Sequence, residues 1–521
     1  MNKLKKKLKS LRRIIFGRTM VVVLGLGLQL YFIVSALVFF SNNLVYFTAA
    51  SNILSLIAIV YIINEKTNPY YKLAWVIPIT LMPIFGTVIY IYVKLELGTH
   101  IMKRRTAELV EKTSEFIPQE EEVLRELSEK DRKESNLAAY MKKFAGYPIY
   151  KNTYAEYYPL GDDMYKAMKT ELLKAKEFIF MEFFIVERGE MWDSILEILE
   201  RKVKEGVDVR FMYDGMCSLM LLPYKYPKVL EEKGIKCKMF FPIKPVLSTV
   251  QNNRDHRKIL VVDGHTAFTG GVNLADEYIN KCVKYGHWKD TGVMLKGDAV
   301  KSFTMMFLQV WNITEREEGD YRSLIKYDFP ELKEGRLETD GFAMPYGDSP
   351  FDNENVGQTV YLDILNRAER YVHIMTPYLI IDNEMTQALT FAAKRGVEVI
   401  IIMPHVPDKV YAYLLARSYY KELISAGVKI YEYTPGFVHA KCFVSDGARA
   451  TVGSINLDYR SFFLHFECGC YFYGSPVVES VEEDVQETLK KCCFITLEDC
   501  KKFNPVKKAV GFVLRLFAPL M

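Results

Sequence analysis

Two short segments of the chain carry a histidine, a lysine and an aspartate at one spacing, H-x-K-x4-D. The first segment is "DHRKILVVDG" and the second is "VHAKCFVSDG". The two triads are His256, Lys258 and Asp263, and His439, Lys441 and Asp446. Because side chains alternate along a strand, each histidine should share a face with its lysine. Such a pair suits nucleophilic or acid–base chemistry on an anion that the lysine stabilises.

A small pair and an asparagine follow each triad at matching positions. The residues are Gly270, Gly271 and Asn273 in the first copy, and Gly453, Ser454 and Asn456 in the second. Glycine-rich turns let backbone and amide groups approach an anion closely. Two such sites brought face to face would surround one phosphate with two imidazoles, two ammonium groups and two amides. One H-x-K match could arise by chance, whereas two copies with five matched positions each are a strong signal.

The sequence around the two motifs is also repeated. "EFIFMEFFIVERGEMWDSILEILERKVKEGVDVRFMYDG", from Glu177, corresponds to "RYVHIMTPYLIIDNEMTQALTFAAKRGVEVIIIMP", from Arg370. Each stretch predicts a strand, an amphipathic helix ended by glycine, and a second apolar strand. The repeat therefore predicts two βαβ units in mixed sheets and an α/β fold class.

Length and composition limit the alternatives. A chain of 521 residues that is half apolar should divide into at least two units. Its net charge of +4 gives little support to a nucleic-acid partner. All nine cysteines lie between Cys217 and Cys500 without regular spacing, which suits a reducing cytoplasm better than a disulfide framework.

The amino-terminal region has the composition of a membrane anchor. Residues 3–18 hold eight Lys and Arg and no acid, and three uncharged runs follow: Thr19–Phe40, Val45–Ile63 and Leu73–Val93. A helix of 22 residues is about 33 Å long, enough to cross a hydrocarbon core of about 30 Å. We therefore expect two or three transmembrane helices in residues 1–95 and a multi-pass protein of the cell membrane.

The sequence does not decide on which side of the membrane the rest of the chain lies, and two peripheral segments need separate interpretation. The basic terminus should be cytoplasmic, so three crossings put the remainder outside, whereas one re-entrant run puts it in the cytoplasm, which the cysteines favour. Residues 96–135 predict a solvated, charged helical linker. The closing "KKAVGFVLRLFAPLM" fits equally a segment lying on anionic membrane lipid or a helix that closes a domain core.

The paired motifs resemble those of the phospholipase D superfamily, in which two H-K-D motifs meet across a pseudo-twofold axis between similar α/β/α sandwich domains. "NNRDHRKILVVDGHTAFTGGVNLADEYI", "TPYLIIDNEM" and the hydrophobic amino-terminal segments are similar to its bacterial cardiolipin synthase branch. The resemblance implies a first phospholipase D-type domain at residues 136–330 and a second at 331–521.

The same resemblance implies the reaction and the residue roles. A phosphatidyl group would pass between two phosphatidylglycerol molecules through a phosphohistidine, giving cardiolipin and glycerol without a cofactor or metal. His256 would be the nucleophile and His439 the acid and later the base. Lys258, Lys441, Asn273 and Asn456 would stabilise the phosphate charge, together with Ser454 as a phosphate-binding residue. Asp263 and Asp446 would brace the site, and Asp290 and Glu467 would each hold one histidine's other ring nitrogen.

Several alternatives accompany this hypothesis. Phospholipase D hydrolysis or transfer to another head group is the nearest, because no residue selects the acceptor alcohol. A silent membrane scaffold is disfavoured because both histidines and both lysines are present, and a nuclease because the chain is not basic enough. His465 stands where the branch usually has asparagine, but His465, Cys468 and Cys470 do not have a standard zinc spacing. The sequence leaves the oligomeric state open.

Overall fold

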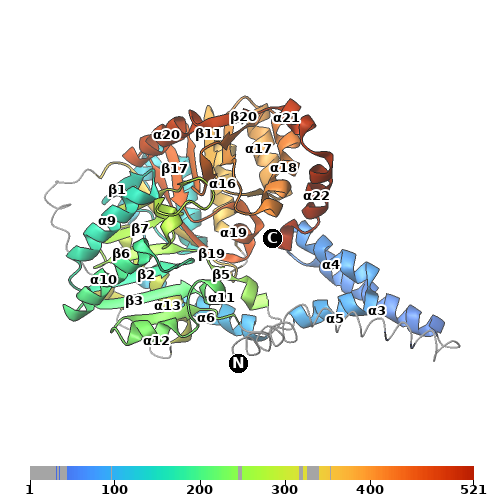
Figure 1. Ribbon diagram of the computed structural model, residues 1–521, viewed down its shortest axis with the longest axis horizontal. Coiled ribbons are helices and arrows are strands. Elements are labelled where there is room, and N and C mark those ends of the chain that lie inside the picture. Colours follow the sequence, from blue (N-terminus) through green and yellow to red (C-terminus); the bar gives the residue numbers. More distant parts are fainter. Residues whose placement is uncertain are drawn as a thin grey trace. The chain divides into compact units, whose positions relative to one another are not determined.

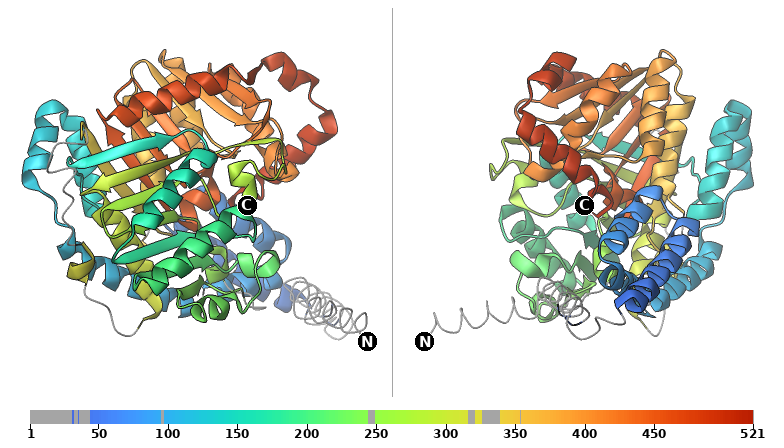
Figure 2. Two further views of the ribbon diagram at one scale, coloured as in Figure 1. Left: turned by 60° about the vertical axis from the view of Figure 1, so that its left-hand side comes forward. Right: turned by 90° about the vertical axis from the view of Figure 1, so that its right-hand side faces the viewer.

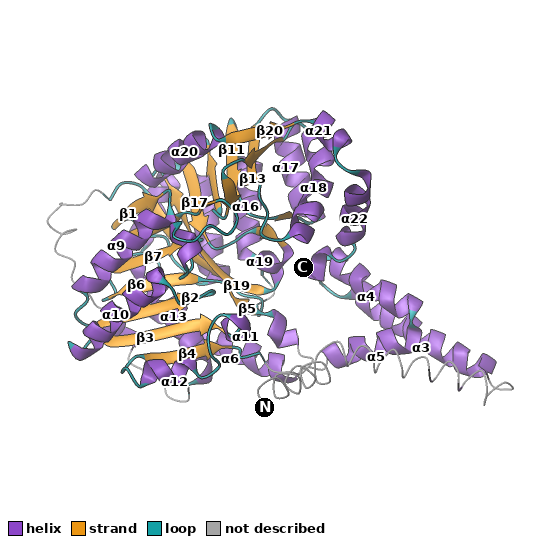
Figure 3. Ribbon diagram, viewed as in Figure 1, coloured by secondary structure: helices purple, strands orange, loops and turns teal. Residues whose placement is uncertain are grey.

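The computed structural model describes residues 31, 35, 44–94, 97–243, 249–315, 321–325, 339–352 and 354–520. The chain divides into two compact units. The smaller contains Met1–Ile101, Ile243–Asn252 and Pro519–Met521, and the larger contains Met102–Pro242 and Asn253–Ala518. Figure 1 shows the elements with their labels, and Figure 3 shows that the strands belong to the larger unit.

The larger unit contains two large sheets whose corresponding strands follow the same spatial order. The first sheet has the order β1-β9-β7-β6-β2-β3-β4, and the second has β10-β19-β17-β16-β11-β13-β14-β20. The strands of the first are β1 (Thr153–Tyr158), β2 (Phe178–Phe183), β3 (Asp208–Asp214), β4 (Lys236–Phe240), β6 (Lys258–Val262), β7 (Thr266–Gly270) and β9 (Gly292–Gly297). Those of the second are β10 (Phe342–Asp348), β11 (Tyr371–Met375), β13 (Glu398–Pro404), β14 (Lys429–Tyr433), β16 (Cys442–Ser445), β17 (Arg449–Gly453), β19 (His465–Tyr473) and β20 (Cys492–Ile495).

The βαβ units predicted from the repeat are present, and the α/β class is confirmed. Helix α10 (Glu190–Lys204) joins the parallel strands β2 and β3, and α17 (Asn383–Lys394) joins β11 and β13. The carboxylate of Asp276 accepts hydrogen bonds from the first amides of α10, and Gly206, with φ +93°, follows its end. Asp276 thus caps the amino end of the helix, and Gly206 allows the chain to leave its carboxyl end before the next strand begins.

Helices cover both faces of each sheet. In the first sheet α9 (Gly161–Lys174) and α10 contact one face, and α13 (Val300–Trp311) packs on the other. In the second sheet, α16 (Val356–Arg367) and α17 contact one face, and α20 (Pro476–Leu489) packs on the other. One apolar cluster contains residues from both sheets, including Val261, Leu295 and Val452, so the two halves share a core. Figure 2 shows the two sets of strands side by side.

The charged segment before the first sheet forms α6 (Leu97–Thr113), α7 (Glu121–Lys130) and α8 (Arg132–Tyr140). It is helical, but the expectation that it is solvated throughout is wrong. Glu134 is fully buried, where it accepts bonds from Arg449 Nε at 2.5 Å and Tyr471 OH at 2.8 Å. The second half supplies these partners for a buried carboxylate, and from Met102 onward the segment belongs to the larger unit.

The smaller unit contains three packed helices, α3 (Leu44–Asn64), α4 (Pro69–Leu81) and α5 (Pro83–Lys94). The expected continuous run Leu73–Val93 is interrupted at Met82, whose φ and ψ are −138° and 72°. Pro83 disfavours a helical conformation in the residue before it, which explains the break. A Cβ on Gly86 would lie 2.7 Å from Ile79 Cα, so this glycine allows α5 to fold back closely on α4.

The spanning helices expected from the sequence are not confirmed. Within the described ranges, no helix is long and apolar enough to cross a membrane. Nearly all of the first run, Thr19–Phe40, and the basic residues before it lie outside the described residues.

The carboxyl-terminal segment contains helix α22 (Pro505–Arg515), which packs on α18 (Val410–Ser425). Gly511 lies at the contact, where a Cβ would meet Leu414 O at 2.6 Å, and Arg515 Nη2 donates to Ser418 O at 2.9 Å. Its other side leaves Phe512 61% exposed. The helix therefore combines features of both interpretations, since it closes one edge of the second half and also presents an apolar face.

Candidate active site

Two short strand pairs connect the halves beside the histidines. β5 (Arg254–Asp255) pairs with the start of β19, and the backbone N–H of His256 donates to Phe466 O at 2.9 Å. β15 (Gly436–Val438) pairs with β8 (His287–Lys289), and the N–H of His439 donates to Lys289 O at 2.7 Å. Each histidine is therefore anchored by its backbone to a strand of the opposite half.

The same strand pairing between the halves brings each imidazole to a carboxylate of the opposite half. His256 Nδ1 lies 2.9 Å and 3.0 Å from the two oxygens of Glu467, and His439 Nδ1 lies 2.6 Å from Asp290 Oδ2. Glu467 is held in turn by the hydroxyl groups of Ser454 and Ser461. A carboxylate on Nδ1 places the proton there and leaves Nε2 as the nitrogen available to attack phosphorus or to carry a proton.

Burial determines the protonation state of the two imidazoles. The pKa of His439 is lowered to about 4, chiefly by burial and then by the charge of Lys441, although Asp290 opposes the shift. Burial also lowers the pKa of His256 well below its usual value, and the charges of Lys258, Lys441 and His439 act in the same direction. Both imidazoles are thus neutral at pH 7. The lysine of each motif also lowers the pKa of the other motif's histidine, so the two motifs share one site.

The two lysines are more buried than lysines normally are. Lys258 and Lys441 are 0% and 1% exposed, and each ammonium group donates to the backbone oxygen of the histidine two residues before it. Burial lowers the pKa of Lys258 to about 8 and that of Lys441 to about 7. An ammonium group has three N–H donors, so this contact leaves donors for a phosphate oxygen.

The three residues assigned to phosphate binding lie in different environments. Asn273 uses its amide internally, because Oδ1 accepts from Ile185 N at 3.0 Å and Nδ2 donates to Tyr278 OH at 2.9 Å. Ser454 donates to the Glu467 carboxylate. Asn456 is 5% exposed, and its Oδ1 has no hydrogen-bond partner among the described residues. Of the three, Asn456 is placed best to meet a ligand, while Asn273 and Ser454 support the walls of the site.

The motif aspartates stand at the far ends of strands β6 and β16. Asp263 accepts the backbone N–H groups of Lys176, Glu177 and Phe178, and Asp446 accepts those of Glu369, Arg370 and Tyr371. Six residues of mostly extended chain lie between each aspartate and its histidine, roughly 20 Å. Both have positive φ, +50° and +57°. They brace the turns that start the next strand pairing and do not touch reacting atoms.

Sequence reasoning missed the aromatic side chains that enclose the histidines. The ring of Phe184 lies 4.9 Å from that of His256, and Tyr278 and Trp288 lie 5.5 Å and 5.4 Å from His439, measured between centroids. These side chains contribute to the burial of the imidazoles, and burial is the largest cause of the lowered pKa of each histidine. Phe184 follows the strand of the first βαβ unit, at the edge where ligands gather, so its position was the available signal.

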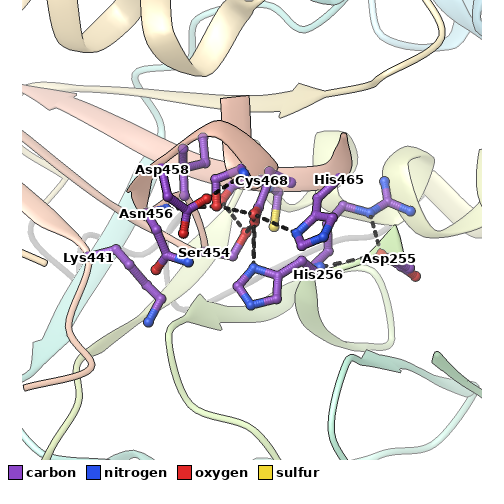
Figure 4. A network of polar contacts seen from close by, with 12 residues as sticks. Asp255, His256, Lys441, Ser454, Asn456, Asp458, His465 and Cys468 are labelled. Atoms are coloured by element: carbon purple, nitrogen blue, oxygen red, sulfur yellow. Dashed lines mark hydrogen bonds and ion pairs between the residues drawn. The ribbon is translucent and has the colours of Figure 1, made fainter. Parts of the chain in front are cut away.

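His465, the departure noted in the sequence, lies beside this network. Its ring centroid is 5.4 Å from that of His256, and its Nδ1 is 3.8 Å from Glu467 Oε1. Figure 4 shows His256, His465, Ser454 and Cys468 gathered around one set of polar contacts. Over the described parts of the chain, Cys468 and Cys470 join no group of residues close enough to share a metal.

Two similar sheets with paired H-x-K motifs are the architecture of the phospholipase D superfamily. A family model described as "Cardiolipin synthase, PLD-like domain" matches residues 168–311 and 361–489, and one described as "Phospholipase_D-nuclease N-terminal" matches residues 53–94. The chain belongs to the bacterial cardiolipin synthase family of that superfamily.

Similar proteins cover most of the chain. An uncharacterised protein of Streptococcus mutans is 47% identical over 464 residues, 89% of this chain and 99% of its own length. Cardiolipin synthase 2 of Bacillus anthracis is 31% identical over 88% of each chain, and a cardiolipin synthase of Clostridium perfringens is 33% identical over 88% of this chain and 95% of its own.

A solved structure supports the fold. The phosphatidylserine synthase of Haemophilus influenzae has a TM-score of 0.54 at 16% identity, covering 74% of this chain and 98% of its own. At that identity the likeness concerns the fold alone.

Proposed function

We propose that the protein is a cardiolipin synthase that transfers a phosphatidyl group from one phosphatidylglycerol molecule to a second, with release of glycerol. The observation that carries this proposal is the crossed pairing of two neutral imidazoles with Glu467 and Asp290 in one buried site. Two imidazoles held this way supply both a nucleophile and an acid–base group, as a two-step phosphoryl transfer requires.

In the first step, Nε2 of His256 attacks the phosphodiester phosphorus and its bond to glycerol oxygen breaks. His439 gives its Nε2 proton to that oxygen, so it must be protonated when the substrate is bound. Its pKa of about 4 in the free protein would rise beside a phosphate anion, and Asp290 stabilises the imidazolium.

In the second step, His439 is neutral and takes the proton from a hydroxyl group of the second phosphatidylglycerol, whose oxygen attacks phosphorus and releases His256. Lys258 and Lys441 stabilise the charge on the phosphoryl oxygens, with the Nδ2 group of Asn456 as a further donor. The wall residues Ser454 and Asn273 keep Glu467 and the first-half loop in place.

The central test uses purified full-length protein in mixed micelles with phosphatidylglycerol as the sole lipid substrate, no nucleotide and a metal chelator. Mass spectrometry should find cardiolipin and glycerol in equal amounts, since the lysines supply the charge stabilisation without a metal. Phosphatidic acid as the only lipid product would identify a hydrolase instead. Restoration of lost activity by one added metal would contradict the proposed site.

The two histidines can be separated with a phosphatidyl ester of nitrophenol, a leaving group that needs almost no acid. His439→Ala should release one equivalent of nitrophenolate in a burst and then stall, because no base activates the acceptor. His256→Ala should give no burst. A burst that survives only in His256→Ala would reverse the assignment.

We also propose that the protein is attached to the cell membrane by its amino-terminal segment, residues 1–95. Apolar side chains on α3 are exposed, among them Leu56 at 60% and Ile57 at 62%. The hairpin of α4 and α5, tightened at Gly86, supports a re-entrant third run rather than a third crossing. Two crossings leave the catalytic domains, residues 136–330 and 331–521, on the cytoplasmic side, where nine free thiols are expected.

The carboxyl-terminal helices supply a second membrane contact in this proposal. A cavity of about 200 Å³ between α18 and α22 is lined by Arg417, Lys421, Lys501 and Lys508 together with Phe503 and Phe512. Basic side chains beside exposed apolar ones suit the head group and acyl boundary of anionic lipid.

A further inference from the structure

His465 takes no part in the transfer chemistry, and its environment is unusual. The side chain is 8% exposed, and neither ring nitrogen has a hydrogen-bond partner among the described residues. A neutral imidazole has one lone pair and one N–H group, and neither is within hydrogen-bond distance of a partner in the described parts of the chain. Buried polar atoms without partners are costly in a folded protein, and an ion that they bind is one of the few explanations.

The nearest polar groups form a set of metal donors. His256, His465 and Glu467 offer ligand atoms that all lie within 4.8 Å of one another. Glu467 Oε1 is 2.9 Å from His256 Nδ1 and 3.8 Å from His465 Nδ1. Around a tetrahedral Zn²⁺ with bonds of about 2.0–2.1 Å, donor atoms are about 3.3 Å apart. The two measured separations bracket that value, and the third, between the two imidazoles, is at most 4.8 Å.

The remaining contacts suit the carboxylate for this role. Ser461 Oγ donates to Glu467 Oε1 at 2.7 Å, and Ser454 Oγ donates to the other oxygen, which fixes the carboxylate between the two rings. Two imidazoles and one carboxylate form a donor set that binds zinc well and leaves a fourth position for water. Hydroxyl groups that orient a ligating carboxylate strengthen such a site.

A second cluster of potential donors, His405, Glu432 and Cys493, is less suited to bind a metal. Its carboxylate already forms an ion pair with Arg417 at 2.8 Å and accepts a hydrogen bond from Tyr420 OH at 3.2 Å. A cation there would face a guanidinium group, so that cluster serves as a control.

We propose that His256, His465 and Glu467 form a reversible binding site for a divalent transition metal such as Zn²⁺, and that its occupation inhibits transfer. Metal on Nδ1 of His256 takes the lone pair that the proton held there, so the proton moves to Nε2 and the imidazole stays neutral. The nitrogen that attacks phosphorus then has no lone pair to donate. Glu467 is diverted from the histidine to the metal at the same time.

The first experiment measures binding without turnover, using full-length protein in detergent micelles after removal of metals by chelation. Zn²⁺ is titrated by calorimetry, and Co²⁺ by its visible absorption, which is intense for four-coordinate sites. Wild-type protein and the control His405→Asn should bind one equivalent, with Kd at least about ten-fold lower than in His465→Asn, since even outer-shell partners are worth about 10–100-fold. No binding by the wild type, or equal binding by His465→Asn, would overturn the proposal.

The second experiment measures inhibition, with each variant compared with its own metal-free rate. Zn²⁺ should abolish the nitrophenolate burst in the wild type and in His405→Asn, and a chelator should restore it. His465→Asn should need at least about ten-fold more Zn²⁺ for the same loss. Stimulation by Zn²⁺, or unchanged sensitivity in His465→Asn, would contradict the inhibitory role. Binding needs no turnover, so the metal site and the proposed reaction can fail independently.

Discussion

At the scale of single residues, the two histidines look equivalent in sequence, but each depends on a carboxylate from the opposite half. His256 is oriented by Glu467, and His439 is oriented by Asp290. A carboxylate on Nδ1 fixes the tautomer and stabilises the cationic ring during the reaction. Changing a carboxylate should therefore disable the chemistry of the histidine that it contacts in space, not the one nearest in sequence.

Glu467→Gln should slow the nitrophenolate burst by about 10²–10⁴-fold, because it weakens the proposed nucleophile His256. Asp290→Asn should leave the burst and slow later turnover to a similar degree, because it weakens His439. Stopped-flow measurement of burst and steady-state rates distinguishes the two. Glu482→Gln, which changes an equivalent contact at 2.9 Å to the buried His373, should alter neither rate. The opposite assignment of effects would refute the crossed pairing as a functional feature.

The lowered lysine pKa values predict the pH dependence. In the proposed mechanism both lysines act as ammonium groups, so kcat/KM should fall as pH rises through about 7 to 8, the pKa values of Lys441 and Lys258. On the acid side, the proposed nucleophile His256 must be neutral, and burial lowers its pKa well below the usual value. The pH profile in micelles should therefore be displaced towards acid. Lys441→Arg, whose guanidinium does not deprotonate, should weaken the alkaline decline even where the rate is lower. An unchanged alkaline limb in that variant would exclude Lys441 as its source.

At the scale of elements, the short pairs β5–β19 and β8–β15 place the histidines. The β8–β15 pair depends on Gly436, where a Cβ would lie 2.4 Å from His287 N and 2.5 Å from His287 O. Backbone atoms cannot yield to that contact without separating the two strands, so the position of His439 depends on the absence of a side chain at this residue.

Gly436→Ala should lower the free energy of unfolding by about 1–3 kcal/mol through overpacking, and it should mimic the loss of His439. The burst should persist while turnover falls. Gly396→Ala is the matched control, because it strains a turn with φ +97° where a Cβ meets nothing within 4 Å. Thermal unfolding should show a loss in both variants, whereas only Gly436→Ala should slow turnover selectively. Equal turnover in the two would mean that β15 does not position His439.

At the scale of the whole molecule, the proposed membrane attachment makes the side of the catalytic domains depend on the number of crossings. Cys282 is exposed and Cys217 is buried, so Cys282 is the informative thiol in the folded protein. With two crossings and a cytoplasmic site, an impermeant thiol reagent added to intact cells should leave Cys282 unlabelled, and it should react after the cells are opened. Cys282→Ser should remove that signal. Labelling of Cys282 in intact cells would place the catalytic domains outside and restore a third crossing.

Local pattern determined the two H-x-K-x4-D copies, the βαβ repeats and the α/β class, because strand alternation and helix periodicity depend on near neighbours in the chain. Pro83 is visible in the sequence. Whether it breaks the helix depends on whether neighbouring helices satisfy the backbone groups that it frees, and the spacing of residues in the sequence does not show this. The partner of each histidine lies 211 or 149 residues away, so only the packing of the two halves decided which carboxylate faces which ring. Packing also decided that Asn273 bonds within its own half, because a buried amide satisfies whichever partners the fold brings to it.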